Sequence, residues 1–413
     1  MEVDTRTDKP FLPYGRQHVT DEDIRAVVEV LKSDYLTQGP AVEAFEEALA
    51  RTVGADNVVA CSNGTAALHL AMLAMGVGEG DVVVTTPITF MASANCARYT
   101  AAAVQFVDVD PNTALIDPDR LERALQRDRQ KKIKAVIPVH FAGQPADLIR
   151  VHEMAREHGA YVVDDACHAL GASFTHRDQV YKLGGNRYSD MTAFSFHSVK
   201  HVAMGEGGAV ATANPDLAER LGRFRNHGIQ QAYPVNSHMA YASDGTPNPW
   251  YHELQELGFN YRVSDLAAAL GRSQLMRLEG SLKRRREIAA LYGELIRERF
   301  EGGEVSPLAV RPNVSHAYHL YVVQVKFDYF GVDRATVMRR LREANIGSQV
   351  HYIPVHLQPY YQKHSGTGPG DCPMAEQYYA RALTIPMYPE LADTDCERVI
   401  DELARALRRV GWK

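Results

Sequence analysis

Short apolar runs rich in β-branched residues alternate with helical stretches from residue 58 onward, and this alternation most narrows what the chain can fold into. The apolar runs are VVACS, DVVVTTP, AVQFVDVD, KAVIPVHF and AYVVDDA. Strands of continuous apolar character, separated by helices of about 10 to 15 residues, are typical of a parallel sheet buried on both faces. The pattern therefore predicts an α/β fold built on a mainly parallel sheet.

Helical and mixed patterns flank this region. On its N-terminal side, residues 21–32 and 42–51 carry apolar side chains at helical spacing, which predicts a helical arm. On its C-terminal side, residues 264–296 form one long helical pattern, followed by the strands HLYVVQVKF and SQVHYI and the helices RATVMRRLREA and DTDCERVIDELARALRR. We therefore expect a large domain over residues 1–275 and a smaller α+β domain over residues 276–413.

The balance of charges narrows the function classes. The 413 residues include 45 Lys and Arg against 51 Asp and Glu, which gives a formal net charge of −6. Binding to a phosphate backbone needs a basic excess, so a nucleic-acid-binding protein is not expected. The basic run 283–286 (KRRR) lies in helical sequence with acidic residues nearby, and we interpret it as a solvated helix face.

Cysteine usage and hydropathy indicate the compartment. The five cysteines form neither a CxxC pair nor a metal-ligand spacing, and their odd number suits a reducing compartment. The 17 histidines include no HExxH pair, so no metal is expected. The N-terminus is charged from its second residue, and no apolar run approaches the roughly 18 residues of a membrane span. We therefore expect a cytoplasmic protein that does not enter a membrane.

A segment of small and hydroxylated residues, SNGTAA at 62–67, follows the first strand and opens a helix. Small residues let backbone N–H groups approach an anion, and the helix dipole together with the hydroxyls favours phosphate. A glycine turn with a threonine cap is the structural alternative. The segment alone leaves both interpretations open.

Two acids, Asp164 and Asp165, end the apolar strand AYVVDDA, and His168 follows three residues after the second. An acid buried without a partner is costly, so one of the two is expected to face a cation in a pocket. The protonated ring nitrogen of a pyridine cofactor is such a cation. A helix cap or a surface acid pair is the alternative.

Lys200 follows the aromatic segment FSFHSV and precedes the glycine-rich turn GEGG. In a pocket of low dielectric the pKa of a lysine falls, and the free amine becomes a nucleophile that forms Schiff bases. A lone lysine is ordinarily a snorkelling surface residue. This one, however, completes a set with the phosphate-type segment and the strand-end acid.

Six motifs link the chain to a known family: SNGTAAL, TPITF, VVDDACHALGA, FSFHSVK, GEGGAV and LGFNYRVSDLAAALG. In their order and separation the chain resembles the sugar aminotransferases of the DegT/StrS type, over about residues 12–410. The resemblance implies the aspartate aminotransferase fold (fold type I), with a mainly parallel seven-stranded sheet in the large domain and a smaller α+β C-terminal domain. It also implies pyridoxal 5′-phosphate (PLP) as cofactor and a homodimer with shared active sites.

The resemblance assigns roles position by position. Lys200 matches the lysine that holds PLP as a Schiff base and moves the proton, and Asp165 matches the acid that pairs with the pyridinium nitrogen. The other matched cofactor positions are Gly64, Thr65 and Ser195 for the phosphate, Phe90 for stacking on the ring, His168 where the family usually has Gln, and Asn260 reaching from the other subunit.

Substrate contacts are implied at two further segments. Thr37, Gln38 and Gly39 match a stretch that touches substrate in relatives, with a plain interhelical turn as the alternative. His351 and Tyr352 are expected to line the sugar pocket, whereas packing is an equal alternative for His319. Ala203 and Met204 replace the usual Thr-Thr before GEGG, which puts sugar contacts near the lysine in question.

Finer features point to a branch of the family. His168, the GQPADL segment and SQVHYIPVHLQPYY resemble enzymes that aminate carbon 4 of a UDP-linked 4-keto-6-deoxy sugar on the way to pseudaminic acid, with L-glutamate as donor. Another dTDP- or GDP-sugar 3- or 4-aminotransferase is the alternative. Relatives that dehydrate sugars typically have His in place of the lysine, and a non-catalytic homologue is expected to lose the lysine or the acid. Lys200 and Asp165 argue against both.

Overall fold

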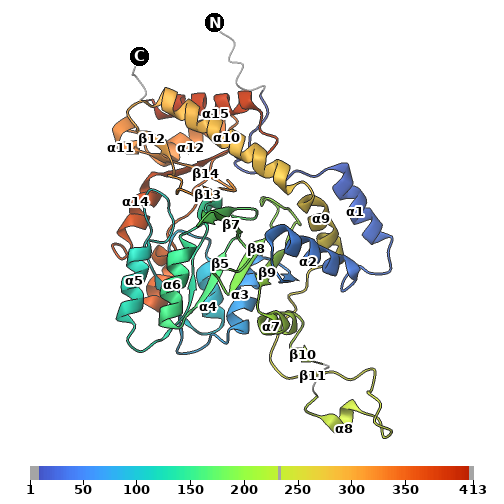
Figure 1. Ribbon diagram of the computed structural model, residues 1–413. Coiled ribbons are helices and arrows are strands. Elements are labelled where there is room, and N and C mark those ends of the chain that lie inside the picture. Colours follow the sequence, from blue (N-terminus) through green and yellow to red (C-terminus); the bar gives the residue numbers. More distant parts are fainter. Residues whose placement is uncertain (1–8, 231–233, 409–413) are drawn as a thin grey trace.

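A seven-stranded sheet forms the centre of the computed structural model, which describes residues 9–230 and 234–408 (Figure 1). The strand order is β1-β9-β8-β5-β4-β2-β3. The strands are β1 (Asn57–Cys61), β2 (Val82–Thr85), β3 (Ala103–Phe106), β4 (Ile133–Ile137), β5 (Tyr161–Asp165), β8 (Met191–Ser195) and β9 (Gly208–Thr212). Only β9 runs antiparallel to its neighbours, so the mainly parallel sheet predicted from the sequence is confirmed.

Helices cover both faces of this sheet, because successive strand residues point to opposite sides. Val83 packs into a core with α3, α4 and α7, whereas the next residue, Val84, packs into a core with α5 and α6. The helix α2 covers a third core near β1 and β9. These helices are α2 (Pro40–Val53), α3 (Gly64–Ala74), α4 (Ala92–Tyr99), α5 (Pro118–Arg127), α6 (Leu148–His158) and α7 (Pro215–Arg225).

The long helical pattern at 264–296 is divided into two helices, α9 (Asp265–Leu275) and α10 (Leu278–Arg299). The helix α9 packs against α2 and α1 (Asp21–Leu31), and α10 continues to the smaller C-terminal part of the chain (Figure 1). The break falls beside residue 275, and the domain boundary there stays a prediction.

The C-terminal part has a core of its own. Its antiparallel sheet has the order β12-β14-β15. Its elements are β12 (Val305–Pro307), β14 (Tyr321–Val325), α11 (Phe327–Phe330), α12 (Arg334–Glu343), β15 (Ala382–Ile385) and α15 (Asp393–Leu407). The prediction of a strand at SQVHYI is wrong, because this segment forms only one isolated bridge, from Gln349 to Thr384.

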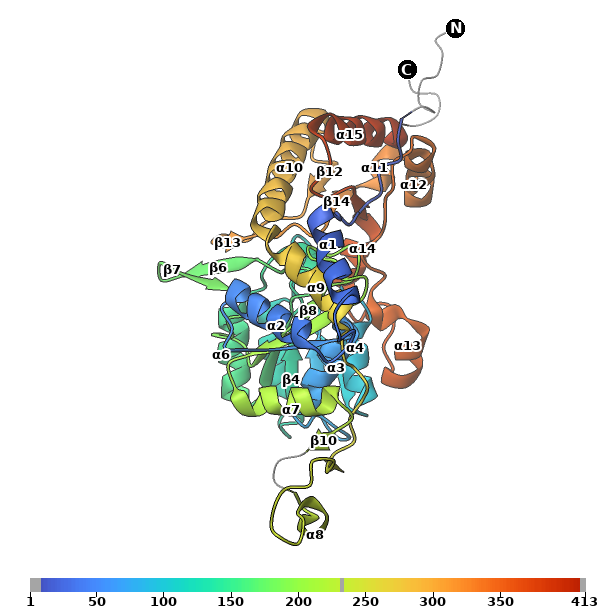
Figure 2. The ribbon, with the colours of Figure 1, turned by 90° about the vertical axis from the view of Figure 1, so that its right-hand side faces the viewer.

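Smaller elements complete the fold. A three-stranded sheet joins β6 (Ser173–His176), β7 (Gln179–Lys182) and β13 (Val314–Ser315). A protrusion with β10 (Ile229–Gln230), α8 (Ser237–Ala240) and β11 (Glu253–Leu254) projects beyond α7 (Figure 2). Within the described parts of the chain, no helix combines the length and the apolar character that crossing a membrane requires.

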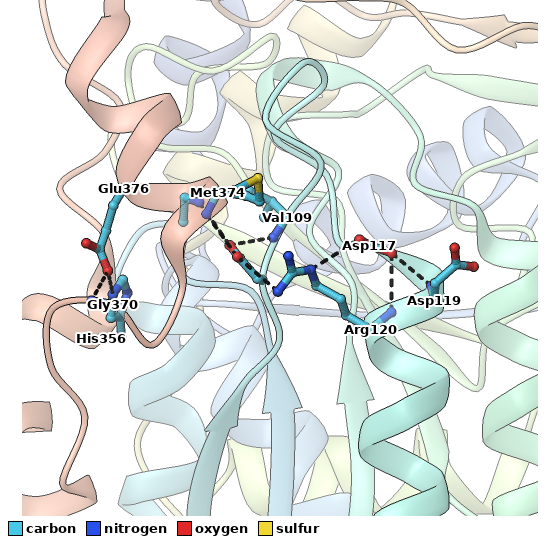
Figure 3. Close-up of polar contacts among 10 residues, drawn as sticks. Val109, Asp117, Asp119, Arg120, His356, Gly370, Met374 and Glu376 are labelled. Atoms are coloured by element: carbon cyan, nitrogen blue, oxygen red, sulfur yellow. Dashed lines mark hydrogen bonds and ion pairs between the residues drawn. The ribbon is translucent and has the colours of Figure 1, made fainter.

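A buried carboxylate fastens the C-terminal part to the ends of the central strands. Asp108 follows β3 and accepts hydrogen bonds from the backbone N–H groups of Met374 (3.0 Å) and Ala375 (2.9 Å), in the first turn of α14 (Pro373–Arg381). Arg120 on α5 lies 3.5 Å from the same carboxylate (Figure 3). The segment before α14 contains η3 (Val355–Leu357) and α13 (Pro359–Ser365), and Val355 N–H donates to the carbonyl of Pro87, which follows β2 (2.9 Å).

Candidate active site

A cavity of about 960 Å³ lies beyond the carboxyl ends of β1, β5 and β8, where ligands collect in sheets of this kind. Its lining joins the three polar segments singled out in the sequence. The predicted site residues that line it are Gly64, Thr65, Phe90, Asp165, His168, Ser195, Lys200, His351 and Tyr352. The structure therefore brings these side chains, which lie far apart in the sequence, into one space.

Lys200 lies in a loop between β8 and β9 that is held by backbone hydrogen bonds. Its own N–H donates to the carbonyl of His197 (2.8 Å), and Met204 N–H donates to the carbonyl of Phe196 (2.8 Å). Burial lowers the pKa of the Lys200 amine from 10.5 to about 8, against the opposing effect of Cys167 and Asp165. A free amine is therefore available near neutral pH, as a nucleophilic lysine requires.

Reaction of the apoenzyme with PLP is expected to accelerate with rising pH and to level off above about pH 8. Only the neutral amine attacks an aldehyde, and the neutral form dominates once the pH exceeds the pKa of the amine. Stopped-flow absorbance at a series of pH values measures the rate, with N-α-acetyl-lysine as the control whose rate keeps rising to about pH 10.5. A profile for the protein that parallels the control would contradict the lowered pKa.

Asp165 is the strand-end acid that faces the cavity. Its Oδ2 accepts a hydrogen bond from Ser93 Oγ (2.6 Å), and its Oδ1 accepts one from the backbone N–H of Cys167 (3.1 Å). The Ser93 hydroxyl in turn lies 2.6 Å from that of Thr89. The neighbouring acid, Asp164, points to the other side of the sheet and accepts from Thr192 Oγ1 (3.2 Å).

Sequence reasoning missed Ser93 and Thr89. Both belong to the loop and helix that follow β2, and both are buried. The TPITF motif contains Thr89 and stops three residues short of Ser93, so an i, i+4 pair of hydroxyls beside that motif was the signal available.

The N-terminus of α3 forms an anion cradle. The Asn63 side chain caps the helix by accepting from Ala66 N–H (2.8 Å). A Cβ at Gly64 would lie 2.8 Å from Ser195 Cβ and 3.3 Å from Cys167 Sγ, so only glycine allows this close approach. A Cβ at Gly208 would meet the Asn63 carbonyl oxygen at 2.3 Å, which explains one glycine of GEGGAV. Backbone N–H groups, the Thr65 and Ser195 hydroxyls and the helix dipole suit a phosphate here.

Aromatic and imidazole rings form the opposite wall. His168 Nε2 lies 3.2 Å from Tyr352 Oη, and its ring centroid lies 4.5 Å from that of His319. Burial holds the pKa of both imidazoles well below the usual range, so they are neutral. Both Nδ1 atoms lack a hydrogen-bond partner among the described residues. Phe90 also lines the cavity, is 54% exposed, and has its ring centroid 6.2 Å from that of Tyr352.

Four predicted residues do not line the cavity: Thr37, Gln38, Gly39 and Asn260. Thr37 forms a bridge with Ser264, and Gly39 N–H donates to Asp265 Oδ2 (2.9 Å). Asn260 is exposed and forms a bridge with Asn226. Their neighbour Tyr261 does line the cavity, with its hydroxyl 3.1 Å from His69 Nδ1.

Three features of the cavity fit PLP as its cofactor. The cradle at Gly64 accepts a phosphate, Asp165 provides a buried carboxylate for a ring nitrogen, and Lys200 provides an amine with lowered pKa. His168 and His319, whose Nδ1 atoms have no partner among the described residues, line the same cavity and would be available to a polar group of the cofactor or substrate. Among the described residues, no group of three or more His, Cys, Asp or Glu side chains could hold a metal ion.

Comparisons with known proteins show the family of this chain. Residues 17–404 match the model of the DegT/DnrJ/EryC1/StrS aminotransferase family. The spore coat polysaccharide biosynthesis protein SpsC of Bacillus subtilis is 41% identical over 392 residues, covering 95% of this chain and 96% of that protein.

Two solved structures have the same fold. Helicobacter pylori PseC, an aminotransferase involved in the biosynthesis of pseudaminic acid, has a TM-score of 0.83 and 26% identity over 96% of this chain and 99% of that one. The PLP form of Spr1654 from Streptococcus pneumoniae, a sugar aminotransferase by its description, has a TM-score of 0.83 and 26% identity over 96% and 98%. The chain therefore belongs to the DegT/DnrJ/EryC1/StrS family and is a PLP-dependent sugar aminotransferase.

Proposed function

We propose that this enzyme transfers the amino group of L-glutamate to carbon 4 of a UDP-linked 4-keto-6-deoxy-N-acetyl sugar of the L-altrose type, in pseudaminic acid biosynthesis. The observation that carries the proposal is the structural likeness to PseC over nearly the whole of both chains. His168, where the family usually has Gln, adds support because its ring contacts both Tyr352 and His319.

Lys200 is the proton carrier in this proposal. Its amine, with a pKa of about 8, changes protonation state near neutral pH and so can both accept and return a proton. PLP, when bound, supplies the electron sink that stabilises the charge left on the donor carbon as that proton departs. Asp165, oriented by Ser93 and by Cys167 N–H, is the carboxylate that would keep the ring nitrogen of the bound cofactor protonated.

The sugar half of the reaction uses the outer part of the cavity. Tyr14, Gln349 and Gln358 line it together with His351 and Tyr352, and these polar groups suit the hydroxyls of a sugar. The volume of about 960 Å³ lies at the upper end of small-molecule sites, which leaves space for a sugar beside the cofactor. The His351 imidazole is fixed through Nδ1 on Thr384 Oγ1 (2.8 Å), and burial lowers its pKa to about 3, so it acts as a neutral group.

A panel of nucleotide sugars tests the substrate. Purified enzyme, L-glutamate and a UDP-, dTDP- or GDP-linked 4-keto-6-deoxy sugar are combined, and the aminated product is identified by mass spectrometry and NMR. We expect turnover of the UDP-linked N-acetylated sugar, with the amine on carbon 4. Activity restricted to a dTDP or GDP sugar, or amination at carbon 3, would replace this proposal with another aminotransferase of the same family.

We also propose that two chains share each active site, with Asn260 reaching the cofactor phosphate of the partner subunit. Asn260 is exposed and lies outside the cavity of its own chain, although the adjacent Tyr261 lines it. A side chain in this position is available to a second copy. Thr37, Gln38 and Gly39, which are also outside the cavity, are proposed to meet the substrate in the same assembled state.

Mixed dimers test this sharing. Lys200→Ala and Asn260→Asp variants are each expected to be nearly inactive, because one lacks the amine and the other brings a carboxylate to a phosphate. A hybrid dimer with one chain of each variant has one intact site out of two. In an equal mixture of the two variants about half of the dimers are hybrids, so the mixture should recover about a quarter of the wild-type activity. Differently tagged chains, co-expressed and purified by both tags, allow the hybrid to be assayed alone. A hybrid without activity would contradict the shared site.

A further inference from the structure

A second cavity, of about 350 Å³, also has Lys200 in its lining and includes four arginines. We call it the arginine cavity. It is lined by Arg16, His18, Lys200, His201, Gln274, Arg277, Gly280, Ser281, Arg284, Arg285, Pro389 and Glu390. Lys200 also lines the cofactor cavity, so one residue borders both cavities.

Arg285 belongs to the basic run 283–286. The sequence predicted that this run forms a solvated helix face, and for Arg285 that prediction is wrong because the residue is buried. Only 2% of this residue is exposed. Its Nη1 donates to the carbonyls of Tyr318 (3.1 Å), His319 (3.4 Å) and Met387 (3.1 Å), and its Nε has no partner among the described residues. These hydrogen bonds all start from Nη1, so the buried Nε is left without an acceptor.

The charges around this cavity do not cancel. Arg277 pairs with Asp23, and Arg284 with Asp393 at 2.7 Å. The acid in the lining, Glu390, pairs with His18. In residues 9–230 and 234–408 neither Arg16 nor Arg285 forms an ion pair with a carboxylate, and Glu390 acts on Arg285 only from a longer distance. A buried guanidinium without a counterion is costly, and a carboxylate matches its planar edge with two parallel hydrogen bonds.

We propose that the arginine cavity binds a carboxylate, held by Arg285 and Arg16, and that the ligand is the side-chain carboxylate of the amino donor. This assignment rests on the proposed use of L-glutamate. The position fits that role because Lys200, whose amine the donor must reach, is one of the residues that line the cavity. A longer amino acid with a terminal carboxylate spans from the reacting lysine toward the arginines, whereas a neutral donor such as L-alanine gains nothing there.

The first test measures the donor half-reaction of the PLP-loaded enzyme without any sugar, by the change in cofactor absorbance. Arg16→Gln removes a cation that has no protein partner, so the fold is expected to be preserved. The concentration of L-glutamate giving half-maximal rate should rise about tenfold, while that of L-alanine stays unchanged. Arg285→Lys keeps the charge but loses the planar edge, and it should show the same selective loss. Arg272→Gln, an exposed arginine of α9 outside the cavity, is the matched control.

The second test separates this inference from the choice of donor. Glutarate, a dicarboxylate that cannot react, is titrated calorimetrically into the PLP-loaded wild type and variants. We expect binding to the wild type and to Arg272→Gln, and affinity at least about tenfold weaker in Arg16→Gln and Arg285→Lys. A wild type that binds glutarate but does not react with L-glutamate would contradict the proposed donor alone. Equal glutarate affinity in all variants, or equal losses for L-glutamate and L-alanine, would overturn the carboxylate site.

Discussion

Replacing Lys200 with alanine is expected to abolish transamination, with a loss of at least about three orders of magnitude, and to leave bound PLP without a covalent link to the protein. The physical reason is that one amine performs two tasks. It attaches the cofactor, and it carries the proton between donor and cofactor, for which its pKa of about 8 is suited. No other lysine lines the cofactor cavity among the described residues, so no neighbour can take its place.

Borohydride reduction followed by peptide mapping measures the attachment directly. The wild type should give one labelled peptide, which contains Lys200, and Lys200→Ala should give none. Lys182→Ala, a change of an exposed lysine on β7, is the control and should keep the label and full activity. A labelled peptide from Lys200→Ala, or normal turnover by that variant, would show that another amine does the chemistry.

The sheet and the main site residues were predictable because their signals are local. A strand buried on both faces needs an unbroken apolar run, and the polar residue that ends it must emerge at the ligand edge. Gly64, Asp165 and Lys200 therefore meet as the sequence pattern indicates. The helix α1 begins at Asp21 and ends at Leu31, one residue short of the expected end, because its amphipathic pattern and acidic first turn are equally local.

Contacts between segments far apart in the sequence were not predictable. Ser93 reaches Asp165 across 72 residues, and no periodicity connects the two. SQVHYI has a strand-like pattern, yet its backbone forms a single bridge because it has to bring His351 and Tyr352 into the cofactor cavity. The burial of Arg285 was also hidden, since a run of four basic residues in a helix does not reveal which of them faces three backbone carbonyls.

Asp165→Asn is expected to lower kcat by about a hundredfold or more while leaving the fold intact. Asparagine preserves the shape of the side chain but removes the charge that keeps the cofactor ring nitrogen protonated, so the ring loses its power to withdraw electrons. The Asp165 carboxylate is buried, with 5% of the residue exposed, and its attraction for a ring cation is weakly screened there. Single-turnover absorbance with L-glutamate measures the proton-transfer step itself.

Ser93 gives this prediction a graded test, because its hydroxyl orients the same carboxylate from 2.6 Å. Ser93→Ala should lower the single-turnover rate by about tenfold, and Ser93→Thr, which keeps a hydroxyl, should restore most of it. In Ser93→Ala the absorbance of the bound cofactor should also respond to pH over a shifted range, which a purely structural defect would not produce. If Asp165→Asn retained the wild-type rate, or Ser93→Ala slowed the reaction more than Asp165→Asn did, the charge on Asp165 would not be what drives proton transfer from the donor.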